Sequence, residues 1–118
     1  MDQWEQLIRV SLIRRGINMI RGTTPTVYIP VVGLDIETLE TIYLTFKQNR
    51  KMITKRENEV TKDIENKRLV LSFSQEETLQ FDDGYIEVQL RGTAAGQKIA
   101  SGIVKTTMGA ILYEGVIE

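Results

Sequence analysis

The spacing of hydrophobic residues changes near residue 20. Before that point, four apolar side chains fall on one stripe at helical spacing: Trp4, Leu7, Ile8 and Leu12. Asp2, with Glu5 three residues later, matches a capping box at a helix start. The pattern therefore predicts a short helix over residues 2–15. A competing interpretation is a strand in which apolar residues alternate with polar ones: Ile8, Val10 and Leu12.

From residue 26 onward, apolar and polar residues alternate with the period of two that is typical of β-strands. The clearest strand spans residues 41–48, in which the inward positions are Ile42, Leu44 and Phe46. Further strands are predicted at residues 26–32, 51–56, 60–64, 68–74, 85–93 and 97–107, with a last one around 111–113. Six to eight short antiparallel strands without long helices indicate a mainly β sandwich or barrel.

Several local signals refine this pattern. Pro25 and Pro30 cannot donate to a strand ladder, so the strand at residues 26–32 is expected at a sheet edge or beside a bulge. In the strand at residues 51–56, Met52 is expected to point inward. Residues 74–77 match a capping box that opens one turn of helix.

Charge is nearly balanced, with 15 basic and 16 acidic residues in 118. A clear cationic excess, which nucleic-acid binding favours, is missing, so no nucleic-acid partner is predicted. One basic cluster does occur between positions 47 and 56: Lys47, Arg50, Lys51, Lys55 and Arg56. Acidic residues follow it at once, which favours a solvated hairpin of alternating charge.

The chain contains no His and no Cys, which excludes disulfides and removes the commonest general base and metal ligand. Glu76 and Glu77 are interpreted as capping residues, and Asp82-Asp83-Gly84 as a turn. Residues 92–96 lack the lysine and helix of a phosphate-binding loop, so they are expected to form a hairpin. The sequence therefore predicts no enzyme, no catalytic residue, no cofactor and no metal.

Three tyrosines keep an alternative open. A carbohydrate-binding platform needs two or three aromatic side chains on one exposed face, and the candidates are Tyr28, Tyr43 and Tyr85, whereas core or sheet-face packing is the competing interpretation. The alternative function is therefore a small carbohydrate- or cell-surface-binding module.

No apolar stretch approaches the length of a membrane span, and the N-terminus lacks the features of a signal peptide. We therefore expect neither membrane insertion nor signal-directed export. The purine-rich codons available to Arg14-Arg15-Gly16 also suggest a ribosome-binding site, so translation from Met19 rather than Met1 is a hypothesis.

Four segments, taken in order, resemble a known family: residues 20–26, 42–48, 71–81 and the hairpin from 87–91 to 100–101. Together they span residues 20–117. Their order resembles small prophage-encoded tail and baseplate proteins of Gram-positive bacteria. It is similar to the immunoglobulin-like N-terminal domain of phage baseplate upper proteins. Residues 1–18 lie outside this pattern, and residues 92–96 are richer in small side chains than the pattern leads us to expect.

This resemblance implies a mainly β, immunoglobulin-like antiparallel sandwich over residues 20–118. The apolar spacing before it predicts a helical extension over residues 1–19. It implies a non-enzymatic structural or assembly component of a phage tail, baseplate or tail-like particle. The expected location is the virion or particle, after synthesis in the bacterial cytoplasm. The implied partners are other tail proteins, further copies of the chain, or both.

The apolar stripe of the predicted helix needs a surface to cover it, because so short a helix is unstable alone in water. The candidate partner-interface residues are Trp4, Leu7, Ile8 and Leu12. They are expected either to cover an open end of their own sandwich or to pack against a neighbouring copy, and the resemblance to repeated tail subunits favours the neighbour.

Overall fold

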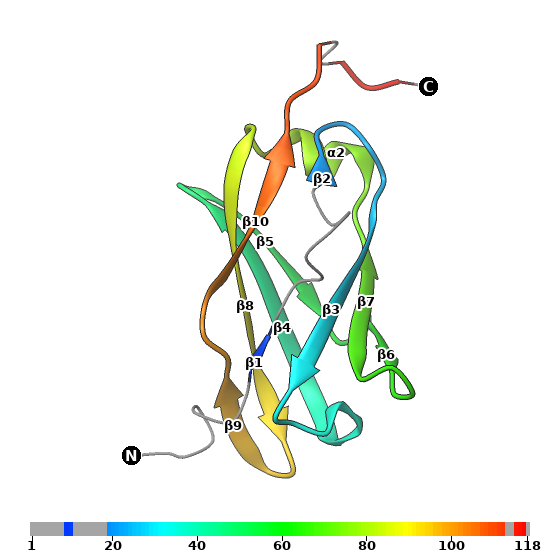
Figure 1. The fold of residues 1–118 in the computed structure, drawn as a ribbon, viewed down its shortest axis with the longest axis vertical. Helices are drawn as coiled ribbons and strands as arrows, with labels where there is room; N and C mark the ends of the chain where they lie inside the picture. Colours follow the sequence, from blue (N-terminus) through cyan, green and yellow to red (C-terminus); the bar gives the residue numbers. More distant parts are fainter. Residues whose placement is uncertain (1–8, 11–18, 113–114, 118) are drawn as a thin grey trace.

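The alternating segments form two β-sheets that pack against each other (Figure 1). The computed structural model describes residues 9–10, 19–112 and 115–117. Within them it places ten strands: β1 Arg9–Val10, β2 Met19–Ile20, β3 Thr26–Val32, β4 Leu39–Gln48, β5 Lys51–Arg56, β6 Thr61–Asp63, β7 Arg68–Ser72, β8 Gly84–Ala94, β9 Gln97–Ala100 and β10 Val104–Gly109. Two short helical turns accompany them, the 3-10 turn η1 at Ile36–Thr38 and α2 at Gln75–Leu79. The prediction of a mainly β protein is confirmed.

The strands divide between a four-stranded and a six-stranded sheet. The smaller sheet has the order β1-β3-β7-β6, and the larger one has the order β2-β10-β8-β4-β5, with β9 also pairing with β8. Neighbouring strands are antiparallel except for β2, which runs parallel to β10 through Met19 and Ile20. The predicted antiparallel pairing is therefore correct for all described pairs but this one.

One core lies between the sheets, formed by the inward side of each alternation. Eight side chains that the sequence pattern assigns to the core are buried, with exposed fractions of 0 to 3%: Ile42, Leu44, Phe46, Leu71, Phe73, Ile86, Val88 and Leu90. The Phe46 and Phe73 rings meet edge to face, with centroids 4.8 Å apart. Burial of each large apolar side chain stabilises the fold by roughly 1.5–3 kcal/mol before ordering costs.

The predicted N-terminal helix is wrong at the two of its residues that the structure describes. Arg9 and Val10 form β1, which pairs antiparallel with Val32 and Val31 at the edge of β3. An open strand edge offers backbone partners that a marginal, isolated helix does not have, and this favours the extended form. The candidate interface residues lie outside the described part of the chain: Trp4, Leu7, Ile8 and Leu12. Met19 is in the core at 2% exposure, so the expected boundary between residues 19 and 20 falls within β2.

Pro30 fits β3 because its nitrogen faces away from β7. The adjacent Val31 N–H donates to the Lys67 carbonyl beyond β7, and successive N–H groups point to opposite sides of a strand. The expected edge position is wrong, because β3 lies between β1 and β7, although β1 pairs only with Val31 and Val32.

Met52 differs from expectation, because 61% of it is exposed and it lies on the outer side of β5. The two-residue turn at Asn49-Arg50 sets Met52 opposite the outward Lys47, which leaves Ile53 partly buried against the core. The register fixed by this turn therefore places Met52 on the solvent side of β5 and Ile53 on the core side.

The return strand predicted at residues 97–107 is divided into β9 and β10 near Ser101. The Ser101 hydroxyl accepts a hydrogen bond from the Leu90 N–H at 3.0 Å, and its own N–H donates to the Leu90 carbonyl at 2.8 Å. A side chain therefore replaces one backbone acceptor of the ladder. Ile111 and Leu112 lie outside strands, so the strand expected around 111–113 is not formed at its described residues.

Candidate interaction surface

The outer side of the six-stranded sheet presents a continuous set of side chains in register. We call this surface the sheet face. Its members, read from the pairing of β4, β5, β8, β9 and β10, are Thr41, Tyr43, Thr45, Lys47, Met52, Thr54, Arg56, Tyr85, Glu87, Gln89, Arg91, Thr93, Lys98, Ala100, Lys105 and Thr107. They point outward because their neighbours along each strand point into the core.

The sheet face is cationic although the chain as a whole carries a net charge of −1. Five of its members are basic, Lys47, Arg56, Arg91, Lys98 and Lys105, and Glu87 alone is acidic. Arg56 is paired with Glu57 at 3.2 Å, so four of the five cations are balanced by acids that this face does not contain, apart from Glu87. Composition alone cannot reveal this surface. Alternation within each strand marks these residues as outward, but only the pairing of distant strands gathers them.

Contacts between neighbouring strands hold parts of this face in place. The hydroxyls of Thr41 and Thr93 are 2.8 Å apart, and those of Thr45 and Thr54 are 3.0 Å apart. A shallow hollow of about 460 Å³ lies beside the first pair and is lined by Arg91 and Lys98 among others. Cross-strand pairs of this kind stabilise the sheet that carries the face.

Of the three tyrosines weighed as a carbohydrate platform, Tyr43 and Tyr85 lie on the sheet face and Tyr28 does not. Tyr28 lies on β3 in the other sheet, under the Arg68 guanidinium at 4.3 Å. Tyr43 lies opposite Arg91 on the sheet face, six residues along β8 from Tyr85, which corresponds to about 20 Å. Two of the three tyrosines therefore share one exposed face, but they lie too far apart to form a compact cluster.

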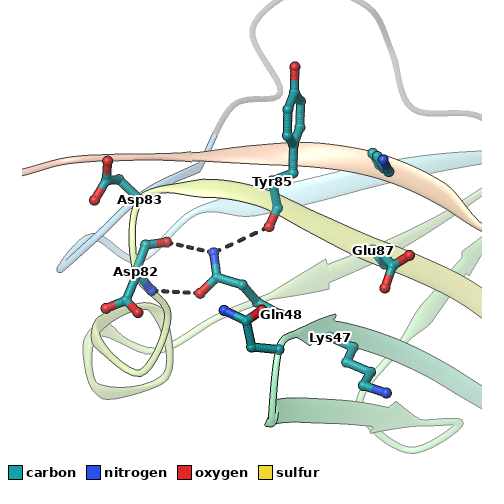
Figure 2. Close-up of a pocket in the computed structure, with 8 residues that line it drawn as sticks. Lys47, Gln48, Asp82, Asp83, Tyr85 and Glu87 are labelled. Atoms are coloured by element: carbon teal, nitrogen blue, oxygen red, sulfur yellow. Dashed lines mark hydrogen bonds between the residues drawn. The ribbon is translucent and has the colours of Figure 1, made fainter.

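A second, polar hollow of about 460 Å³ lies where β4 ends and β8 begins (Figure 2). Gln48, which is buried, donates to the carbonyls of Asp82 and Tyr85 at 2.8 and 3.2 Å and accepts from the Asp82 N–H at 2.8 Å. The Tyr85 ring points away from this amide. Gln48 therefore fixes the turn before β8, and its amide is occupied by backbone rather than left for a ligand.

The basic cluster of the β4–β5 hairpin is only partly solvated, contrary to the sequence interpretation. Lys55 is 6% exposed, and its ammonium group lies 2.9 and 3.0 Å from the two carboxylate oxygens of Glu77. The same ammonium group lies 5.0 Å from the centre of the Phe73 ring. Glu77 is also the third residue of α2, where it completes the predicted capping box with Ser74. The capping prediction is confirmed, whereas the burial of Lys55 had no signal in the sequence.

These contacts set the protonation of Glu77. Burial acts to raise its pKa, but the Ser74 N–H at 2.8 Å and the Lys55 ammonium group outweigh it, so the pKa is lowered from its ordinary value of 4.5. An ion pair with a lowered carboxyl pKa and filled hydrogen bonds suits a structural role better than acid–base chemistry, which needs a pKa near the working pH.

The remaining polar candidates have structural roles. The hairpin predicted at residues 92–96 is confirmed between β8 and β9, where Ala95 and Gly96 have φ values of 51° and 81°. Among the residues that the structure describes, no three acidic side chains gather as a metal site requires. The described residues also include no helix that is long and apolar enough to cross a membrane.

No protein-family model matches this sequence, and no curated protein matches it.

Proposed function

We propose that this protein is a non-enzymatic structural subunit of a phage tail, baseplate or tail-like particle, built as an immunoglobulin-like sandwich. The supporting observation is the order of strands in both sheets. It agrees with what the sequence resemblance implies for residues 20–118.

The correspondence follows strand by strand. Immunoglobulin-like domains place strands A, B, E and D in one sheet and strands C, F and G in the other, with an added C′ strand beside C in some types. Here β3, β7 and β6 take the places of B, E and D, while β4, β8 and β10 take those of C, F and G. β5 corresponds to C′. The first sheet then has the order A-B-E-D when β1 is counted as A.

We further propose that the sheet face is the assembly surface, and that its partner is an acidic surface on a neighbouring particle subunit. Because Arg56 forms an ion pair with Glu57 at 3.2 Å, the charge complementarity comes from the other four cations against one anion. A matching acidic surface would be attracted and a second basic one repelled. Exposed apolar side chains at Met52 and Tyr85 supply contact area beside the charges.

Residence in a particle is tested directly on the producing bacterium. Particles released after prophage induction are separated on a density gradient, and each fraction is analysed by mass spectrometry. The proposal expects peptides of this chain to sediment with tail or baseplate proteins, and expects tail genes beside its gene. Recovery only in the slow fractions, together with a gene neighbourhood that lacks tail, capsid and lysis genes, would refute it. The intact mass of the particle-bound chain also decides between translation from Met1 and from Met19.

The surface is tested by charge reversal. Lys47→Glu with Arg91→Glu should reduce incorporation into particles at least several-fold, with the circular dichroism unchanged. The matched control is Lys67→Glu, an exposed cation in the turn before β7, away from the sheet face. Equal incorporation of both variants refutes the assigned surface but not the particle role. Loss of DNA binding instead of particle binding would show that the partner is nucleic acid.

A further inference from the structure

The sheet face carries positive charge that its own neighbours in the fold leave unpaired. Its four cations other than Arg56 are exposed, and none forms an ion pair with another described residue: Lys47, Arg91, Lys98 and Lys105. Arg91 and Lys98 line one hollow whose described lining contains no acidic residue. Against Glu87 alone, the four cations leave three positive charges in excess.

A matching excess of negative charge lies at the end of the molecule where β4 begins, and we call this surface the acidic end. Its five carboxylates are exposed and have no cationic partner among the described residues: Asp35, Glu37, Glu40, Glu59 and Glu65. Lys62 and Lys67 are the cations at this end whose side chains are described and that lack a carboxylate partner. Five anions against these two cations leave three negative charges in excess.

Contacts between elements hold the acidic end together. Asp35 caps η1 directly before β4, where its carboxylate accepts the Glu37 N–H at 3.1 Å. The Lys62 ammonium group on β6 donates to the Glu37 carbonyl at 3.4 Å, which places β6 beside η1. The segment after β5 returns to β4, because the Glu57 carboxylate accepts the Ile42 N–H at 3.0 Å. Figure 1 shows β6 and the turn between β3 and β4 toward the same end of the molecule, opposite α2.

We propose that the acidic partner of the sheet face is the acidic end of a second copy of this chain. The inference rests on the proposed function, because it takes the sheet face as the assembly surface. Two sheet faces repel each other, and so do two acidic ends, whereas one surface of each kind attracts the other. The contact therefore joins two different surfaces and leaves each copy with one of each still free. A head-to-tail contact of this kind repeats from copy to copy and produces a closed ring or an open chain.

An exchange of charges between two variants tests this contact. One variant carries Arg91→Glu with Lys98→Glu on the sheet face. The other carries Glu37→Lys with Glu65→Lys on the acidic end. Sedimentation velocity of the full chain should show reversible association of the wild type that weakens several-fold as salt is raised, because salt screens exposed charges. Each variant alone should associate at least several-fold more weakly than the wild type. Their equimolar mixture should regain association, because the reversed sheet face of one variant then meets the reversed acidic end of the other.

Matched controls carry the same charge changes away from both surfaces. Arg50→Glu, in the turn before β5, and Glu76→Lys, on α2, alter exposed residues and should leave association unchanged. Arg91→Gln with Lys98→Gln replaces the reversed sheet-face variant if circular dichroism shows that reversal unfolds the protein, and should weaken association less.

A wild-type chain that stays monomeric at every concentration and salt overturns the proposal. A mixture that fails to regain association overturns it as well. Particle incorporation distinguishes this failure from failure of the proposed function. If the chain is monomeric but Lys47→Glu with Arg91→Glu still lowers incorporation, the sheet face binds a different subunit and only the second-copy assignment falls. Association of the purified chain without its recovery in particle fractions refutes the particle role and leaves the contact between copies in place.

Discussion

The buried ion pair between Lys55 and Glu77 gives the sharpest test of the energetics of this fold. Glu77→Gln removes the carboxylate charge but keeps a side chain that can still complete a capping box. Lys55 then remains buried, with 7% of its side chain exposed and no opposite charge within bonding distance. Lys55→Met makes the opposite change, because it removes the cation and retains an apolar chain beside Phe73.

The two variants should differ strongly in stability. Removing one member of a buried pair typically costs about 3–5 kcal/mol, because the other charge is left uncompensated. The Glu77 side chain is 27% exposed, so water offsets part of this cost and we expect about 2–4 kcal/mol for Glu77→Gln. Lys55→Met should cost about 1 kcal/mol or less, since Glu77 keeps its bond from the Ser74 N–H and can be hydrated.

Urea unfolding followed by circular dichroism measures these free energies, and the double variant completes a thermodynamic cycle. Lys55→Met combined with Glu77→Gln should be more stable than Glu77→Gln alone, because the stranded charge is gone. A cost for Glu77→Gln no larger than that for Lys55→Met would refute the reasoning. So would single costs that add to within about 0.5 kcal/mol in the double variant, as independent sites do.

Three further outcomes follow from the structure. Because the pKa of Glu77 is lowered in the folded state, the stabilisation by its carboxylate is complete above pH 4.5 and is lost as the pH falls through the lowered pKa. The difference in unfolding free energy between wild type and Glu77→Gln, measured by urea titration, should therefore become smaller below pH 4.5. Gly92→Ala should lower the unfolding free energy by about 3 kcal/mol or more, because a Cβ there would lie 2.1 Å from the Thr41 carbonyl oxygen. Gly102→Ala should be nearly neutral, because a Cβ there would have no atom within 4 Å. Thermal unfolding measures both variants. Gln48→Ala should cost about 1 kcal/mol and speed hydrogen exchange at the start of β8, since it removes three partly buried hydrogen bonds to the backbone of Asp82 and Tyr85; unchanged exchange would contradict this.

The local pattern of the sequence was enough to predict most of the strands and their inward faces. Leu44 and Phe46 in β4, and Val88 and Leu90 in β8, are buried as their alternation predicts. The capping box at α2 and the hairpin between β8 and β9 were also predictable. All of these depend on residues within a few positions of one another, so the chain carries the information locally.

Features that depend on pairing between distant segments could not be predicted in this way. The parallel contact of β2 with β10 joins Met19 to Met108, and the inward turn of Lys55 follows from the register of a hairpin and a partner on α2. The extended state of Arg9 depends on an open edge of β3 that only the assembled sheet provides.

The sequence by itself determined a β fold with a defined set of core residues, because burial of apolar side chains imposes a period that is visible along the chain. The tertiary structure alone decided where the charges gather. The cations of the sheet face come from five strands, between Lys47 and Lys105. Net charge and local alternation contain no record of which strands become neighbours, and that adjacency is what creates the sheet face.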